Sequence, residues 1–355
     1  MTWAGALALW WRFDGLYGQD PFAYFDYATG PARASLIRLG FLPSFYWPPG
    51  YPVLVAFASF VLGPIPLAGQ LVSLLAGGAT AVFTGLLARE VWQPNAGHAS
   101  SVTCFLLAGL LVALNAQLVQ SSVVVMSDAT GLAAATLGVW ALARYGRVGK
   151  AGWLWLASGA LAWAIVTRWI YGLVAVPCAA YVLWVLLRRA RACQKLLALR
   201  HGLGAALVSG LILLPVIIPA LTSLVRSTGP APFAVDLEVY RWNPLNAFQR
   251  EFVTADGHLS YAWPNGLYYA LAPAHIYYFT PLLALFIVLG VWAVWQRRSI
   301  EWWLLIVGWA AMVYAFHAGA AWQNFRFTLA YLPPLAVLAA AGLVEMQQRL
   351  RPRYA

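Results

Sequence analysis

Four ionisable side chains stand beside long apolar stretches of the chain, where charge is costly. The acids are Asp20 and Asp128, and the cations are Arg168 and Arg326. A carboxylate in such a position can act as a general base on a hydroxyl. Arginine offers a planar, permanently charged fork that fits a phosphate. The set therefore suggests group transfer from a lipid phosphate, although each residue could instead snorkel or form a structural ion pair.

The elements that must position these charges are membrane-spanning helices. The chain has 355 residues, 62% of them hydrophobic and 9% charged, and its mean hydropathy is +0.72. Its repeated apolar runs have roughly the length that a helix needs to cross a bilayer, about 20 residues. We predict an all-α polytopic integral membrane protein with about ten spans, at Thr2–Trp11, Leu67–Leu87, Ser101–Ser121, Val124–Ala143, Gly152–Thr167, Ile170–Leu187, Leu203–Val225, Ile276–Trp295, Trp302–Phe316 and Phe327–Met346.

The distribution of charge predicts the orientation of these spans. The formal net charge of +11 does not indicate nucleic-acid binding, because the basic residues form short clusters between apolar runs. Alternate connections carry 14 of the 22 Lys and Arg but only 3 of the 11 acids. By the positive-inside rule these connections are cytoplasmic. Asp20, Asp128, Arg168 and Arg326 would then lie together on the outer side of the cytoplasmic membrane.

Two long connections fall on that outer side, at residues 12–66 and 226–275. In the first, Pro21–Leu39 and Tyr51–Leu62 are apolar but do not fit as spans, so we expect interfacial or re-entrant helices. Nothing in the composition marks a separate soluble domain, and we predict one transmembrane domain over residues 1–355. Three cysteines give no disulfide framework.

Five segments carry a resemblance to a known family. Asp20–Ala28 resembles the first outer loop of the GT-C fold glycosyltransferases, which include protein O-mannosyltransferases and the lipid A aminoarabinose transferase. Trp47–Pro52, Ser127–Ala129, Ala162–Arg168 and Arg326–Pro334 follow in the same order as motifs of that group. The resemblance therefore covers most of the chain. It departs from the family pattern after the first acid, where a proline replaces the usual glutamate.

The resemblance implies a GT-C-like helical bundle and an inverting enzyme. Such an enzyme moves a sugar from a polyprenyl-phosphate carrier to an acceptor hydroxyl of a glycan, lipid or protein outside the cytoplasm. It implies that Asp20 is the general base, that Arg326 binds the donor phosphate and that Arg168, where a lysine is commoner, is a second cationic contact. Asp128 would orient the loop or bind acceptor or an ion, and Tyr24 would contact substrate.

Other candidate residues allow both a functional and a structural interpretation. Trp263 and Tyr268 lie near carboxylates in the loop 226–275, and could bind sugar or form an interfacial aromatic belt. His317 and Asp128 could contribute to a divalent metal site, but the spacing gives no ligand motif and therefore favours an isolated interfacial histidine. Asp26 lies six residues after Asp20, so the two carboxylates should not share a helix face.

A transporter or flippase of lipid-linked sugars is the alternative function, since charges inside the membrane also serve permeation. The sequence has no repeated halves and no pair of matching Gly/Pro-broken spans. Its charges gather at one membrane face rather than stepping across the midplane. These features favour the enzyme.

Overall fold

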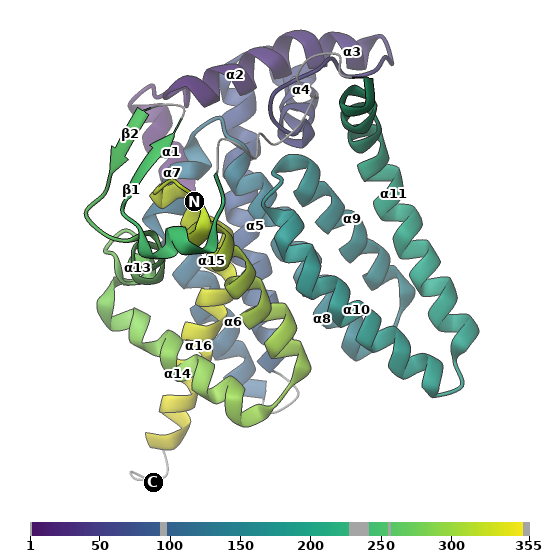
Figure 1. The fold of residues 1–355 in the computed structure, drawn as a ribbon, viewed down its shortest axis with the longest axis vertical. Coiled ribbons are helices and arrows are strands. Elements are labelled where there is room, and N and C mark those ends of the chain that lie inside the picture. Colours follow the sequence, from purple (N-terminus) through teal and green to yellow (C-terminus); the bar gives the residue numbers. More distant parts are fainter. Residues whose placement is uncertain (1, 93–97, 227–240, 255–256, 351–355) are drawn as a thin grey trace. The chain divides into compact units, whose positions relative to one another are not determined.

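The structure is a computed structural model that describes residues 2–92, 98–226, 241–254 and 257–350 (Figure 1). The regular secondary structure of these residues consists of helices and one two-stranded hairpin. Among the described residues, six helices are long and apolar enough to cross a membrane, and the bent pair Ser100–Ala113 and Ala116–Val123 could make a seventh span, which confirms the prediction of an all-α polytopic membrane protein. The six helices are α5 (Pro66–Trp92), α10 (Tyr171–Arg191), α11 (Lys195–Arg226), α14 (Thr280–Arg297), Trp302–Gly319 and Phe325–Leu350. The predicted number of about ten spans remains a prediction.

Several predicted spans differ from the helices that form. The helix α1 (Thr2–Trp10) has nine residues, about half of what a span needs. The predicted span Ser101–Ser121 is broken into α6 (His98–Ala113) and α7 (Ala116–Val123). A third predicted span begins later than expected, as α8 (Ser127–Val148). Its neighbour α9 (Ala151–Thr167) matches the prediction closely.

Hydrogen bonds from distant segments explain the late start of α8. The backbone N–H of Val125 donates to the carbonyl oxygen of Gly15 at 3.0 Å, and the hydroxyl of Ser73 donates to the carbonyl of Met126 at 3.2 Å. Met126 has extended backbone angles. These bonds commit the segment before Ser127 to contacts outside any helix, which apolar character alone does not reveal.

The chain forms two compact units. Unit 1 consists of Met1–Thr80, Leu118–Gly172 and Leu186–Val235, and unit 2 of Ala81–Gln117, Leu173–Val185 and Asp236–Ala355. The single-domain organisation expected from the sequence stays a prediction.

In unit 1, the first loop forms the helices that the sequence predicts. One helical segment runs through α2 (Gln19–Tyr27), a π-helical turn over Ala28–Ala32 and α3 (Arg33–Ile37). Pro31 lies in the π-helical turn, where its missing N–H removes a helical hydrogen bond. The helix α4 (Gly50–Leu62) follows and packs against this turn.

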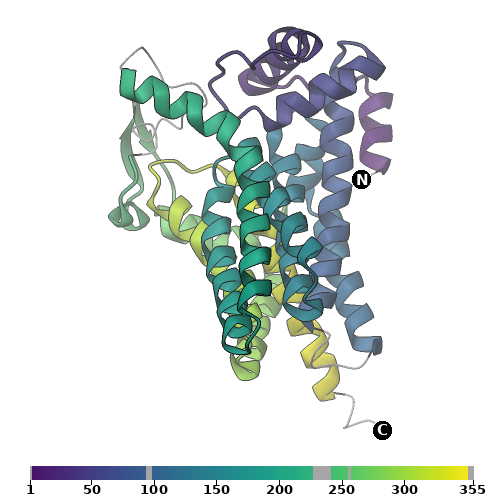
Figure 2. The same ribbon diagram turned by 90° about the vertical axis from the view of Figure 1, so that its right-hand side faces the viewer.

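The rest of unit 1 is built on α8, α9 and α11, which lie side by side in that order (Figure 1). Small residues allow close approach, because a Cβ at Gly138 would lie 2.7 Å from the side chain of Leu161. Figure 2 shows that α11 is bent, and Pro215 and Pro219 within it each remove a helical hydrogen bond.

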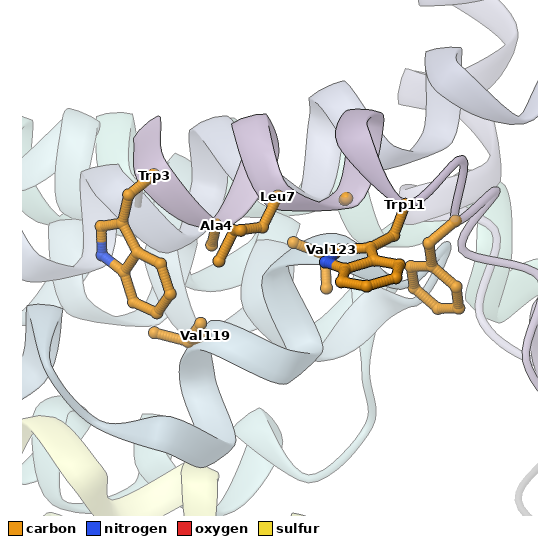
Figure 3. Close-up of a pocket in the computed structure, with 8 residues that line it drawn as sticks. Trp3, Ala4, Leu7, Trp11, Val119 and Val123 are labelled. Carbon is orange, nitrogen blue, oxygen red and sulfur yellow. The ribbon is translucent and has the colours of Figure 1, made fainter.

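The short helix α1 lies along α7 and leaves an apolar groove of about 270 Å³ between them (Figure 3). The groove is lined entirely by apolar side chains, namely Trp3, Ala4, Leu7, Ala8, Trp11, Phe13, Val119 and Val123. Its only polar side-chain groups are the indole N–H of Trp3 and Trp11, and it presents no charged side chain to a phosphate.

Unit 2 pairs α14 with α16 (Leu332–Leu350) at very short range. A Cβ at Gly290 would overlap the carbonyl oxygen of Leu338, and a Cβ at Gly342 would overlap that of Phe286. Such backbone contact needs glycine at both crossing points. One end of the pair is tied by Arg297, which donates to Glu345 at 3.3 Å.

The described residues of the large loop in unit 2 form several short elements. It contains a 3₁₀ turn at Pro244–Phe248, the antiparallel strands β1 (Glu251–Thr254) and β2 (Gly257–Ser260), and the helix α13 (Asn265–Leu271). The helix α13 packs against α15 (Trp309–Gly319). The hairpin is a strand element that the sequence analysis did not anticipate.

Candidate functional site

Asp20 lies in the first turn of α2, the helix that begins the first loop. Gly18 precedes it with a φ of 84°, a backbone conformation that side chains other than glycine rarely adopt. Asp20 is half-buried, whereas Asp26 is exposed. The two carboxylates therefore lie in different surroundings, as their six-residue spacing predicts.

Tyr24 lies one helical turn after Asp20 and is 5% exposed. Its ring stacks on Trp47 with centroids 5.0 Å apart, and meets Tyr51 at 5.5 Å and Phe45 at 5.8 Å in edge-to-face geometry. Aromatic pairs of this kind contribute about 0.5–1.5 kcal/mol each beyond burial. The aromatic turn after the first loop helices thus fixes the ring of Tyr24, and with it the helix that carries Asp20.

The hydroxyl of Tyr24 reaches across to the start of α8. It shares a hydrogen bond of 3.1 Å with the hydroxyl of Ser127, and both residues are buried. Burial raises the pKa of the Tyr24 phenol to about 12, while the Ser127 hydrogen bond and the charge of Arg168 lower it. Tyr24 therefore stays protonated at any physiological pH.

Asp128 follows Ser127 and forms an ion pair with Arg168. The carboxylate lies in the first turn of α8, where the helix dipole favours negative charge. Arg168 is the residue at which α9 ends, in extended conformation. The Asp128 side chain is 4% exposed and that of Arg168 is 22% exposed. A guanidinium has five N–H donors, more than this one carboxylate can use.

Four sequence-predicted residues therefore gather in unit 1. Tyr24 is the link, since it lies one turn from Asp20 and is bonded to Ser127, the neighbour of Asp128. The charges of Asp20, Asp128 and Arg168 all influence its pKa. The charge pattern of the sequence predicts that Asp20, Asp128 and Arg168 lie at one membrane face, but it does not predict the Asp128–Arg168 pair or the role of Ser127.

Arg326 lies in unit 2, in a 3₁₀ turn at Phe325–Tyr331 that leads into α16. Asn324 caps this turn, since its side-chain oxygen accepts from the backbone N–H of Arg326 at 3.0 Å. The guanidinium lies 5.8 Å from the ring of Phe327, and the side chain is half-buried. The Asn324 cap thus fixes the backbone at the start of the turn, from which the Arg326 side chain extends.

Trp263 and Tyr268 flank the start of α13 in unit 2. Trp263 is 53% exposed, and its carbonyl accepts a hydrogen bond from the side chain of Gln323 at 2.6 Å. Tyr268 is half-buried, and burial raises its pKa. The exposed indole face of Trp263 is the kind of surface on which a sugar can stack. Asp236, Glu238 and Asp256 of the same loop lie outside the described residues.

His317 does not present a metal ligand site. Its ring is buried between Tyr269 and Phe327, at centroid distances of 5.3 Å and 5.3 Å in stacked geometry. Among the described residues, no group of three or more His, Cys, Asp or Glu side chains could hold a metal ion. The carboxylate of Asp128 forms an ion pair with Arg168. The described side chains therefore do not fit the divalent metal that the sequence left open.

Comparison with protein-family models and with curated protein sequences finds no match. Solved structures are similar over nearly the whole chain. ArnT from Cupriavidus metallidurans in the apo state has a TM-score of 0.63 and 18% identity, covering 99% of this chain and 61% of ArnT. The same protein bound to undecaprenyl phosphate gives 0.63 and 17%, covering 96% and 59%.

The archaeal oligosaccharyltransferase AglB from Archaeoglobus fulgidus, in complex with an inhibitory peptide and a dolichol-phosphate, has a TM-score of 0.55 and 14% identity. The alignment covers 95% of this chain and 47% of AglB. The chain thus spans about three fifths of ArnT and about half of AglB. These similarities confirm the predicted GT-C fold.

Proposed function

We propose that this chain, built on the GT-C fold, is a membrane glycosyltransferase that uses a polyprenyl-phosphate sugar as donor. The observation that carries the proposal is the gathering of Asp20, Tyr24, Asp128 and Arg168 in unit 1. ArnT, which shares the fold, has been solved with undecaprenyl phosphate, and AglB with dolichol-phosphate. A lipid-linked donor is consistent with a fold whose helices are apolar enough to cross a membrane.

In this mechanism Asp20 is the general base. Its carboxylate accepts the proton of the acceptor hydroxyl as the hydroxyl oxygen forms a bond to the anomeric carbon. The bond from that carbon to the phosphate oxygen breaks, and the carrier phosphate leaves with the electron pair. Attack opposite the leaving group inverts the anomeric centre. A half-buried carboxylate with a rigid aromatic neighbour suits this task, because the base must be held in place to act.

Arginine provides for the charge that develops on the departing phosphate. We assign Arg326 as a ligand of the donor phosphate and Arg168 as a second cationic contact. The Asp128 carboxylate pairs with Arg168 at the end of α9. The role that we propose for Asp128 is to orient this guanidinium. Trp263 and Tyr268 are proposed to contact a sugar, since one presents an exposed indole and the other a half-buried phenol.

The acceptor is a glycan, lipid or protein hydroxyl, and the reaction takes place on the extracytoplasmic side of the cytoplasmic membrane. This sidedness rests on the excess of Lys and Arg on alternate connections. Asp128 and Arg168 lie at ends of α8 and α9 that these basic connections do not occupy.

The test is sugar transfer by the purified full chain with a panel of polyprenyl-phosphate sugars. We expect transfer to an added acceptor with equimolar release of the carrier phosphate. Asp20→Asn should slow transfer by about 10²–10⁴-fold, and Arg326→Ala should raise the KM for the donor more than Arg326→Lys does. Carrier flipping across vesicles without any transfer would favour the flippase alternative. If both Asp20→Asn and Arg326→Ala transferred sugar at the normal rate, the assignment of base and phosphate ligand would be wrong.

A further inference from the structure

A second charged region lies in unit 1, at the opposite end of α8 from Asp128. Here the α8–α9 and α10–α11 connections meet, because Arg189 donates to the carbonyl oxygen of Gly149 at 3.0 Å. Lys150, Arg191 and Lys195 are exposed in these connections, and Arg200 is exposed in the second turn of α11. The described acids of unit 1 are Asp14, Asp20, Asp26 and Asp128, none of them in these connections. This end of the unit is therefore strongly cationic.

Specific contacts fix the scaffold beneath these cations. The guanidinium of Arg189 lies 4.8 Å from the centre of the Tyr145 ring, and the Tyr145 hydroxyl is 3.0 Å from Nδ1 of the buried His201. Gly149 ends α8 in the left-handed conformation, with a φ of 77°. A Cβ there would run into Arg189. The two connections thus have a defined arrangement, held by Arg189.

A stripe of six exposed leucines and one isoleucine, called the leucine stripe, leads away from this cationic end along α11. Its members are exposed by 50–72% and recur every three or four residues, so they share one helix face: Leu196, Leu199, Leu203, Leu207, Leu211, Leu214 and Ile218. The stripe begins beside Lys195 and runs for most of the helix. The positive-inside pattern accounts for cations at this end of a span, and the apolar face that begins beside them gives those cations a place to bind a charged lipid headgroup.

The composition of α11 identifies what covers this face. Helices that pack together in membranes use small residues, and α11 presents its small residues to α9. Ser209 donates to the carbonyl of Ser158 at 3.4 Å, and Gly204 lies against the indole of Trp155. The opposite face carries large aliphatic side chains, which suit acyl chains rather than a partner helix.

We infer that this part of unit 1 is a binding site for an anionic phospholipid. Lys150, Arg191, Lys195 and Arg200 bind the headgroup phosphate, and the acyl chains lie along the leucine stripe of α11. Basic side chains at the membrane surface attract anionic lipids in this way. The site lies at the other end of α8 from Asp128, and it holds whether or not the chain transfers sugar.

The experiment uses the full chain, delipidated in detergent, and native mass spectrometry with phosphatidylglycerol or phosphatidylcholine as probe. The test variant is Arg191→Gln/Lys195→Gln/Arg200→Gln. A matched control removes three exposed arginines from other places, as Arg12→Gln/Arg38→Gln/Arg250→Gln. A charge-preserving variant, Arg191→Lys/Lys195→Arg/Arg200→Lys, guards against a test variant that fails to fold.

The inference predicts that the wild type, the control and the charge-preserving variant retain phosphatidylglycerol in preference to phosphatidylcholine. The test variant should bind phosphatidylglycerol about tenfold more weakly or worse. Excess inorganic phosphate should not displace the lipid, because the stripe contributes to its binding. The inference would be overturned if the wild type retained the two lipids equally, or if the test variant retained phosphatidylglycerol normally. It would also be overturned if the charge-preserving variant lost phosphatidylglycerol, or if inorganic phosphate displaced this lipid from the wild type.

Discussion

The hydrogen bond between Tyr24 and Ser127 makes a quantitative prediction about how the first loop is held. Both hydroxyls are buried and they lie 3.1 Å apart. Ser127→Ala leaves the phenol without this partner in a site that excludes water, and Tyr24→Phe leaves the serine hydroxyl in the same position. Each loss should lower the free energy of unfolding by about 1–2 kcal/mol.

The double variant Tyr24→Phe/Ser127→Ala should cost about as much as either single variant. Removing both partners leaves no buried hydroxyl behind, which is nearly neutral beyond the lost bond. The expected coupling energy is therefore about 1–2 kcal/mol. Thermal and denaturant unfolding of the full chain in a mild detergent would measure it.

Thr136→Ala provides the control for this cycle. Thr136 is buried in the same helix α8, and its hydroxyl donates to the carbonyl of Leu132 at 2.7 Å. It lies nine residues after Ser127, which is about 14 Å along the helix. Its effect should add to that of Tyr24→Phe. Additive effects of Tyr24→Phe and Ser127→Ala would refute the reasoning, because they would show that the two hydroxyls do not serve each other.

Three further predictions concern the same unit. Arg168→Met should cost about 3 kcal/mol or more of unfolding free energy and Asp128→Asn only about 1–2 kcal/mol. The first change removes the counter-charge of a buried carboxylate, and the second removes that of a partly solvated guanidinium. Equal or reversed costs in chemical unfolding would contradict this. Gly50→Ala should lower the free energy of unfolding by about 1–3 kcal/mol, because a Cβ at position 50 would lie 2.7 Å from the carbonyl oxygen of Val166 in the last turn of α9. Gly30→Ala is the control and should be neutral in a thermal unfolding assay of both variants, since nothing lies within 4 Å of a Cβ at position 30. Tyr24→Phe should leave the shape of the pH–rate profile of sugar transfer unchanged below pH about 10, because the pKa of Tyr24 is raised to about 12 and the phenol stays protonated throughout this range. If one limb of the pH–rate profile disappeared in Tyr24→Phe, Tyr24 would titrate in this range and the reasoning would be wrong.

Composition and charge patterning predicted the class of the fold and the grouping of Asp128 with Arg168. They could do so because helix ends that carry alternate connections lie on one side of a membrane. The pairing itself depends on where α8 begins and α9 ends, which hydropathy resolves only to within a few residues.

The contact between Tyr24 and Ser127 was beyond sequence reasoning. The two residues are 103 positions apart, and a hydroxyl pair leaves no periodic signal. The late start of α8 escaped for a related reason, since Val125 is apolar but its backbone bonds to Gly15. The sequence left His317 open as a possible metal ligand without a ligand motif, and the structure packs its ring between those of Tyr269 and Phe327.

The most direct test of the proposed activity compares two carboxylate-to-amide variants on one helix. Asp20→Asn removes the proposed base, and Asp26→Asn changes an exposed carboxylate of the same helix. The measurement is acceptor-dependent release of polyprenyl phosphate from a polyprenyl-phosphate sugar under single-turnover conditions. We predict that Asp20→Asn slows release by about 10²–10⁴-fold while Asp26→Asn remains close to the wild-type rate. Equal rates for the two variants would contradict the assignment of Asp20 as the general base.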